Sequence, residues 1–187
     1  MKPVRILGNW DEGYVLDNHM EKSIFLGYDK NGKEIFENTR TALGELIYQY
    51  KYMQNTQAMD KIMLMIKPFL DRWKIKQKIN LVIPVPPSNK NRKFQPVFEL
   101  AKQISSYLKK ECRCDILHKN NNAQAKDGYN ITGTIQQIKK ISNPSNILIV
   151  DDLISSGKTL IETCKIINKD KNIKRIYCLI MTKTKRR

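Results

Sequence analysis

Two adjacent carboxylates and a hydroxyl-rich turn form the part of the sequence best suited to bind a ligand. Asp151 and Asp152 follow the apolar run 147–150, and three positions later begins the segment Ser155, Ser156, Gly157, Lys158 and Thr159. Carboxylates accept hydrogen bonds from sugar hydroxyls. Free N–H groups and hydroxyls at the start of a helix bind phosphate. The spacing therefore predicts a sugar-phosphate site, with the acids on the sugar and the turn on the phosphate.

A buried strand and a helix must position these groups. Residues 147–150 are Ile, Leu, Ile and Val without polar alternation, which is typical of a strand buried on both faces of a parallel sheet. After the turn, we expect a helix whose buried face carries Leu160, Cys164 and Ile167. Open α/β sheets bind ligands at the carboxyl ends of their strands. The sequence places its acidic pair at such an end.

Two other interpretations of this stretch are weaker. The triplet Gly157-Lys158-Thr159 is similar to the end of a Walker A loop, but that loop needs a glycine at the position that Asp152 occupies. An ordinary strand with an acidic helix cap would not need so many phosphate-binding groups. We therefore expect neither an ATP-binding loop nor a purely structural turn.

The stretch resembles the phosphoribosyl-diphosphate signature of type I phosphoribosyltransferases: an apolar strand, two acids, a Thr-Gly-x-Thr turn and an apolar residue. Ser156 stands where threonine is usual, and the matching residues are Val150, Asp151, Asp152, Leu153, Gly157, Thr159 and Leu160. The resemblance implies that the two acids bind the ribose hydroxyls and that residues 155–159 bind the 5′-phosphate. Purine-salvage members often carry an aspartate at the position of Ser155, so the resemblance does not favour a purine acceptor.

A second strand, loop and helix resembles the corresponding unit of ComF-like phosphoribosyltransferases. Residues 81–85 are predicted to form a buried strand, and Pro96 begins a helix with an apolar face. The basic loop between them contains Ser88, Lys90 and Arg92. The resemblance implies that these three side chains bind pyrophosphate. The alternative is a solvated basic loop, since loops rich in Lys and Asn are common in this chain.

The polar segment 118–130 lacks hydrophobic periodicity and is predicted to be a mobile loop. In the family, a loop at this place closes over the site. ComF-like proteins have a basic residue, a Gln and an Asn along it, and their counterparts here are Lys119, Gln124 and Asn130, with Lys126 in the same loop. The spacing of Ile131, Ile135 and Ile138 then predicts a short helix.

Residues 1–80 are expected to flank this core. Residues 23–36 are predicted to form a hairpin around Asn31-Gly32, acting as a hood over one end of the site. Two helices follow, the first capped by Thr39 or Thr41 and the second broken or kinked at Pro68. We predict an α/β fold in a single domain over residues 1–187. Residues 41–182 form a mainly parallel, doubly wound sheet with helices, and residues 1–40 form the hairpin or hood region.

Composition limits the classes of function. The cysteines form no C-x-x-C pair, so neither a zinc ribbon nor the N-terminal zinc module usual in ComF-like proteins is supported; they are Cys112, Cys114, Cys164 and Cys178. Without a long apolar run or a signal peptide's apolar region, we expect a soluble, cytoplasmic protein. The net charge of +16 fits nucleic acid or phosphorylated ligands. It also fits the coding bias of an AT-rich genome, since Lys far exceeds Arg.

The predicted function is transfer of a phosphoribosyl group from phosphoribosyl diphosphate, with release of pyrophosphate, to an acceptor that the sequence does not identify. The resemblance implies Mg²⁺ as cofactor, held mainly by the ligand's own oxygens and by water, without direct protein ligands. The alternatives are a non-catalytic sensor of phosphoribosyl diphosphate or nucleotide and a ComF-like DNA-associated protein. A homodimer and a nucleic-acid partner stay open, and no general base is assigned.

Overall fold

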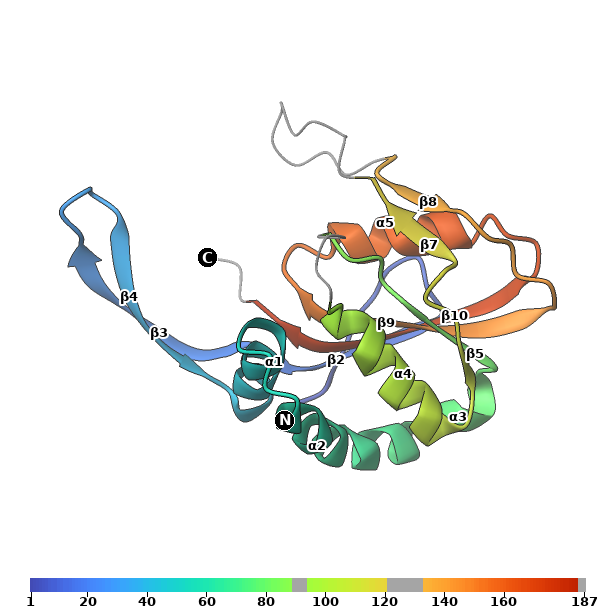
Figure 1. Ribbon diagram of the computed structural model, residues 1–187, viewed down its shortest axis with the longest axis horizontal. Coiled ribbons are helices and arrows are strands. Elements are labelled where there is room, and N and C mark those ends of the chain that lie inside the picture. The colour runs from blue at the N-terminus through green and yellow to red at the C-terminus, as the bar shows by residue number, and fades with distance from the viewer. Residues whose placement is uncertain (89–93, 121–132, 185–187) are drawn as a thin grey trace.

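The centre of the molecule is a six-stranded sheet (Figure 1). The structure is a computed structural model that describes residues 1–88, 94–120 and 133–184. Its strands are β1 (Val4–Arg5), β2 (Glu12–Asn18), β5 (Leu81–Pro84), β6 (Glu111–Cys112), β9 (Ser145–Ile154) and β10 (Ile173–Lys183). They lie in the order β1-β2-β10-β9-β5-β6, and every pairing except that of β1 with β2 is parallel. The predicted α/β fold with a mainly parallel sheet is confirmed.

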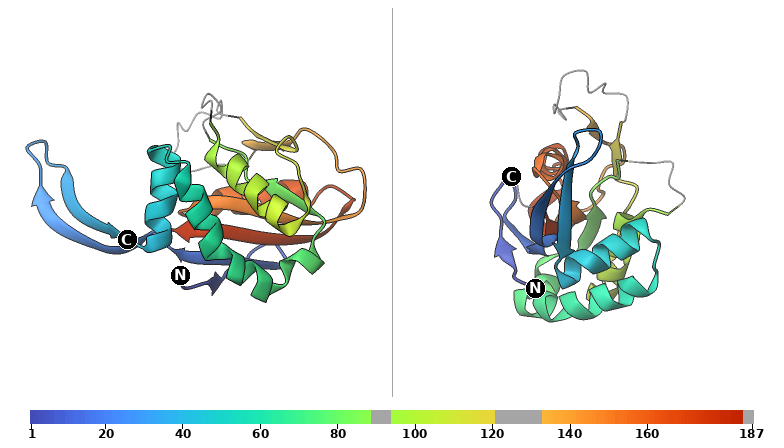
Figure 2. Two further views of the ribbon diagram at one scale, coloured as in Figure 1. Left: turned by 60° about the horizontal axis from the view of Figure 1, so that its bottom comes forward. Right: turned by 90° about the vertical axis from the view of Figure 1, so that its left-hand side faces the viewer.

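Helices cover both faces of this sheet. One face carries α1 (Ala42–Tyr52), α2 (Gln57–Trp73), the short α3 (Ile75–Lys78) and α4 (Pro96–Leu108), and the other carries α5 (Lys158–Ile167) (Figures 1 and 2). On β9, Leu148 and Val150 belong to the first core, whereas Ile147 and Ile149 belong to the core beneath α5. Side chains alternate between the two faces of a strand. A strand buried on both faces therefore has no polar position, as residues 147–150 show.

The helices expected after residue 40 are present. The Thr41 hydroxyl accepts a hydrogen bond from the Gly44 N–H at 3.0 Å, so Thr41 is the cap of α1. The second helix, α2, continues through Pro68 and is not broken there. Phe69, Leu70 and Trp73 follow the proline and are buried in the core. Their burial offsets the helical hydrogen bond that a proline removes. No helix in the described ranges is long and apolar enough to cross a membrane.

The N-terminal segment supplies a strand that the sequence pattern did not predict. Residues Glu12–Asn18 form β2, which pairs in parallel with β10 along its length. Val15 and Leu16 are almost completely buried, one in each core. Part of the region that the sequence assigned to the hairpin therefore lies in the main sheet. An apolar segment this short has no periodicity strong enough to separate a strand from a loop.

The predicted hairpin is present, but its position differs from the prediction. Strands β3 (Met20–Tyr28) and β4 (Glu34–Arg40) pair in an antiparallel manner, and the turn between them contains Gly32 with φ of 73°. Glycine adopts this left-handed conformation without strain. The hairpin projects away from the sheet instead of covering the site (Figures 1 and 2). Turn chemistry specifies a hairpin locally, whereas its direction depends on how its base packs.

A small second sheet replaces the helix that was predicted around residue 135. Strands β7 (Leu117–Lys119) and β8 (Ile135–Gln137) are antiparallel neighbours. Ile135 is buried in the core that contains α5, whereas Ile138 is exposed. The helix prediction is therefore wrong for the described part of this segment; Ile131 lies outside it. Strand β7 is separate from β6, which ends at Cys112.

Candidate functional site

A pocket of ≈ 330 Å³ opens at the carboxyl ends of β5 and β9. Its walls come from the segment after β5, the start of α4, the end of β9, the turn that leads into α5 and one residue of α1. The lining residues are Lys51, Val85, Pro86, Pro87, Ser88, Gln95, Pro96, Val97, and 151–160. The acidic pair and the five residues predicted to bind phosphate thus share one pocket.

The turn at residues 155–157 presents its polar groups to this pocket. Strand β9 runs through both acids to Ile154, so the acids lie within the end of the strand and not after it. Helix α5 begins at Lys158, and Gly157 before it has φ of 76°. Glycine permits this left-handed turn, and Ser155 and Ser156 are exposed beside it. The first turn of a helix leaves N–H groups without partners in that helix, which makes this wall suitable for an anion.

Asp152 forms an ion pair with Lys51, a residue that the sequence pattern did not single out. The Lys51 Nζ lies 2.9 Å from Asp152 Oδ1, and Asp152 is only 7% exposed. Burial opposes the charge of Lys51, but the Asp152 carboxylate outweighs this effect and raises the pKa of Lys51. Lys51 comes from the last turn of α1, and 101 positions separate it from its partner. No local spacing could have indicated this contact.

Asp151 is the carboxylate of the pair that forms no ion pair with any side chain in the described ranges. One of its oxygens accepts a hydrogen bond from the Asp152 backbone N–H at 2.9 Å. Burial, together with the negative charge of Asp152, raises the pKa of Asp151 to about 8, although Lys51 opposes the shift. Near neutral pH, the Asp151 carboxyl group is therefore protonated in part of the population. In that form it can donate a hydrogen bond as well as accept one.

A buried chain of hydrogen bonds supports the acidic pair from behind. The Thr182 hydroxyl on β10 donates to the Asp152 carbonyl oxygen at 3.3 Å, and His19 Nδ1 lies 3.1 Å from the same hydroxyl. His19 is buried, and its burial lowers its pKa, with the charges of Arg40 and Lys51 adding to the effect. A neutral His19 can donate from Nδ1 to Thr182. The sequence assigned His19 no role, and its place here is structural support of β9.

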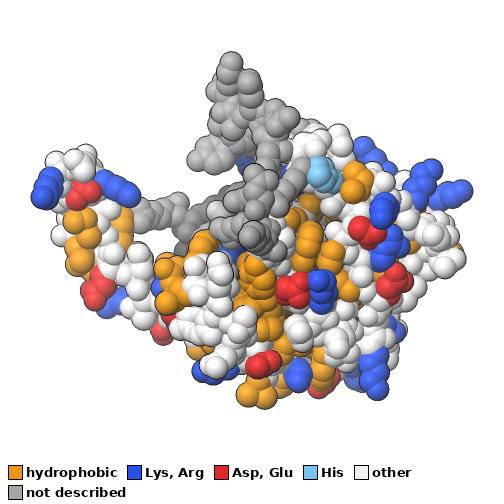
Figure 3. Space-filling view, viewed as in Figure 1, with side chains coloured by type: hydrophobic (Ala, Val, Ile, Leu, Met, Phe, Trp, Pro, Cys, Tyr) orange, Lys and Arg blue, Asp and Glu red, His pale blue; other side chains and the backbone are white. Residues whose placement is uncertain are grey.

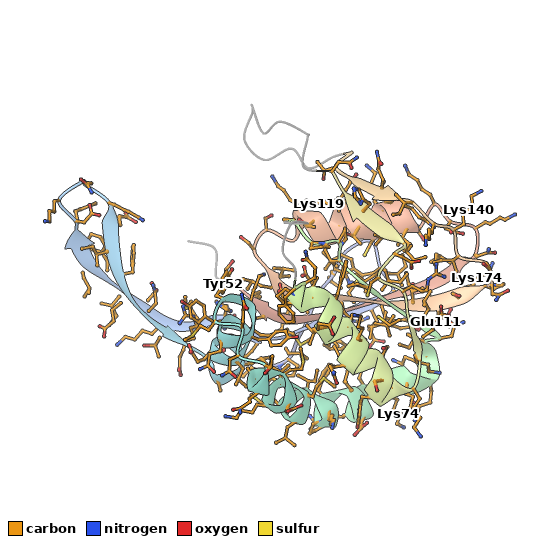
Figure 4. The ribbon with its side chains drawn as sticks, in the orientation of Figure 1. Tyr52, Lys74, Glu111, Lys119, Lys140 and Lys174 are labelled. Atoms are coloured by element: carbon orange, nitrogen blue, oxygen red, sulfur yellow. The ribbon has the colours of Figure 1, made fainter. Side chains whose placement is uncertain are left out.

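Ser88 and Lys119, predicted from two different loops, meet beside the pocket. Lys119 Nζ donates to Ser88 Oγ at 3.0 Å, and Ser88 lines the pocket. Burial lowers the pKa of Lys119, whereas Asp151 opposes that change. Figure 4 marks Lys119 at the end of β7 and Tyr52, the neighbour of Lys51, at the end of α1. The other residues predicted from these loops lie outside the described residues: Lys90, Arg92, Gln124, Lys126 and Asn130.

The donor set of the pocket also bears on the expected metal ion. Within the described part of the chain, no group of three or more His, Cys, Asp or Glu side chains comes together to hold a metal. Asp152 is already paired with Lys51. Mg²⁺ characteristically keeps several waters and takes one or two carboxylates together with the phosphates of a substrate. The pocket fits a Mg²⁺ ion that enters with a phosphorylated ligand.

Comparison with known proteins identifies the fold of this chain. Residues 98–187, which contain the acidic pair and the phosphate turn, match the family model described as phosphoribosyl transferase domain. The fold is that of the type I phosphoribosyltransferases. A crystal structure of an adenine phosphoribosyltransferase superposes with a TM-score of 0.50 at 15% identity, covering 86% of this chain and 84% of that one. No curated protein matches the sequence.

A second phosphoribosyltransferase structure gives the same result. The adenine phosphoribosyltransferase of Saccharomyces cerevisiae, complexed with an imino-altritol bisphosphate and adenine, has a TM-score of 0.51 at 14% identity. The similarity covers 87% of this chain and 83% of that one. At such low identity the likeness establishes the phosphoribosyltransferase fold, and the bound ligands belong to the yeast enzyme.

Proposed function

We propose that this chain binds phosphoribosyl diphosphate in the pocket at the ends of β5 and β9 and transfers its phosphoribosyl group to an acceptor, releasing pyrophosphate. The observation that carries this proposal is that the acidic pair and the phosphate turn line one pocket. Their order along the chain is that of the phosphoribosyl-diphosphate signature. The match of residues 98–187 to the phosphoribosyl transferase domain supports the same class of reaction.

In this proposal, each wall of the pocket has one task. The backbone N–H groups and hydroxyls of residues 155–159 hold the 5′-phosphate. Asp151 and Asp152 bind the ribose hydroxyls, and the ion pair with Lys51 fixes the direction of the Asp152 side chain. Ser88 and Lys119, together with Lys90 and Arg92, hold the pyrophosphate. The resemblance implies that the loop containing Gln124, Lys126 and Asn130 excludes water from the bound substrate.

The chemistry of transfer requires charge stabilisation more than covalent help from the protein. The bond from C1′ to the pyrophosphate oxygen breaks with both electrons leaving on the pyrophosphate, while a nucleophile on the acceptor attacks the opposite face of C1′. Positive charge develops on the ribose, and the Asp152 carboxylate together with the ionised fraction of Asp151 stabilises it. When bound, Mg²⁺ would neutralise part of the negative charge of the pyrophosphate. The protein contributes positioning of the two reactants and electrostatic stabilisation.

The acceptor is proposed only by exclusion. Ser155 occupies the position where purine-salvage members often carry an acid, and serine cannot exchange a proton with a purine ring in the same way. We therefore favour an acceptor other than a purine, used by a cytoplasmic, ComF-like member of the family. The resemblance of residues 81–93 to the ComF-like loop supports that subtype. A sensor that binds phosphoribosyl diphosphate without transfer is the second candidate, because the sequence assigns no general base.

Two measurements test the proposal. Isothermal titration calorimetry with phosphoribosyl diphosphate and Mg²⁺ should show saturable binding, and absence of binding at millimolar ligand would refute both the enzyme and the sensor. Pyrophosphate release with a panel of bases and amines then separates the two, since a sensor binds without release. For the DNA-associated alternative, affinity for DNA should fall steeply with salt if many phosphates are contacted. A flat salt response would exclude that role.

A further inference from the structure

The four cysteines form two close pairs of thiols that the proposed reaction does not use. Cys112 Sγ lies 3.8 Å from Cys114 Sγ, and Cys164 Sγ lies 3.7 Å from Cys178 Sγ. All four are free thiols. Cys164 and Cys178 are completely buried in the core beneath α5, whereas Cys112 and Cys114, the C-x-C pair, are half-buried. A reagent from solvent therefore reaches the C-x-C pair more readily than the buried pair.

The backbone directs both thiols of the C-x-C pair to one side of the sheet. Cys112 ends β6, and side chains two residues apart in an extended chain point to the same face. Cys112 packs against the core that contains α4, but Cys114 packs in neither of the two cores. A free cysteine commonly serves as a small apolar side chain. Packing alone does not account for the place of Cys114.

The surroundings of the pair favour a thiolate at Cys114. The hydrogen bond from Cys112 lowers the pKa of Cys114; burial opposes this shift, Lys102 adds to it, and Glu99 and Asp115 oppose it. The same hydrogen bond and burial raise the pKa of Cys112. Lys102 and Glu99 form an ion pair at 2.7 Å on α4, a helix on the side that Figure 3 shows, where acidic and basic side chains are neighbours. Cys114 is thus the better nucleophile of the pair.

A thiolate beside a second thiol is the arrangement that thiol–disulfide exchange requires. We propose that Cys112 and Cys114 form a dithiol site that reacts with low-molecular-weight disulfides. The Cys114 thiolate attacks one sulfur of the small disulfide, which forms a mixed disulfide and expels one small thiolate. Cys112 then gives up its proton and attacks Cys114 Sγ, and the second small thiol leaves with that proton. The pair loses two electrons, and the small disulfide gains them.

Closing this disulfide requires only a local change of the chain. Two residues of extended chain span about 6.4–6.8 Å, which lies at the upper end of the range of about 4.4–6.8 Å between the Cα atoms of a disulfide. Regular strand structure ends at Cys112, so the irregular residues 113–116 can contract. The site is also separate from the pocket. Cys112 lies opposite Val82 of β5, and neither cysteine lines the pocket.

Oxidation of the full chain by glutathione disulfide tests the site. The reduced protein is incubated with excess glutathione disulfide, quenched with acid, denatured and alkylated. Digestion after Glu111 and Asp115 then releases residues 112–115 as one peptide for mass spectrometry. This peptide should lose two hydrogens and take up no alkylating reagent, whereas Cys164 and Cys178 should stay reduced. A 112–115 peptide that stays reduced would overturn the proposal, and so would equally fast oxidation of the buried pair.

Single variants test the role of each thiol. Cys112→Ser lacks the second thiol, so a mixed disulfide with glutathione should accumulate at Cys114. Cys114→Ser should react at least about threefold more slowly than Cys112→Ser, because a pKa one unit higher means about a tenth of the thiolate, which higher nucleophilicity offsets only in part. Equal rates of the two variants, or no mixed disulfide in Cys112→Ser, would overturn these roles. Far-ultraviolet circular dichroism shows that each variant is folded.

Discussion

Replacement of Lys51 by methionine should weaken both the fold and the site, because it leaves Asp152 buried without its cation. At 2.9 Å and an effective dielectric constant of about 20, the attraction between the two charges is about 6 kcal/mol. The desolvation of both groups offsets most of that energy. Exposed pairs contribute about 0–1 kcal/mol, and loss of a partner from a fully buried pair costs about 3–5 kcal/mol. With side-chain exposures of 22% and 10%, we expect a loss of about 2 kcal/mol.

Thermal unfolding and calorimetry measure this effect. A loss of about 2 kcal/mol should lower Tm by about 4–8 °C for a chain of this size. Affinity for phosphoribosyl diphosphate should fall as well, because the unpaired Asp152 carboxylate adds negative charge beside the phosphates. Lys51→Arg keeps a cation and should lose less, and Lys61→Met, on an exposed position of α2, is the matched control.

A double-mutant cycle provides the decisive result. In the background of Asp152→Asn, the further change of Lys51 to methionine should cost much less than it does alone, because the buried carboxylate is already absent. A coupling energy below about 0.5 kcal/mol, or a Lys51→Met variant with the Tm and the affinity of the wild type, would refute the role assigned to Lys51.

Three further predictions follow from the same region. Asp151→Asn combined with Asp152→Asn should abolish ribose-dependent binding of phosphoribosyl diphosphate while circular dichroism stays unchanged; a folded double variant with wild-type affinity in calorimetry would contradict the assignment. In the unfolded chain Asp151 loses its proton near pH 4, whereas in the folded protein its pKa of about 8 holds the proton up to about pH 8. The free energy of unfolding should therefore decrease as pH rises from about 4 to about 8. Asp151→Asn should flatten that decrease in thermal melts, and an unchanged slope would argue against the shift. Gly44→Ala should lower Tm markedly, since the added Cβ would overlap the His19 carbonyl oxygen; a melt like that of the wild type would show that α1 can move at no cost.

The prediction from sequence succeeded where the signal was local. The unbroken apolar run 147–150 indicated a strand buried on both faces, and each of its side chains does enter one of the two cores. Helices with a clear apolar face, such as α4 from Pro96, were also predicted. Short segments were the weak point. Ile135 lies in a strand because it pairs with Lys119 and is buried beneath α5, and neither contact is visible in the spacing of three isoleucines.

The sequence by itself determined that the acidic pair and the phosphate turn lie together. A strand end, a positive-φ glycine and a helix start are specified there by consecutive residues. Only the tertiary structure decided which of the two acids is paired. That choice depends on where α1 crosses the sheet. This position brings Lys51 to Asp152 across 101 residues, whereas Asp151 forms no ion pair within the part of the chain that the structure describes. The direction of the hairpin is likewise a product of packing at its base. Local chemistry therefore specified the ligand-binding groups, and long-range packing decided which of the two acids forms an ion pair and which has a raised pKa.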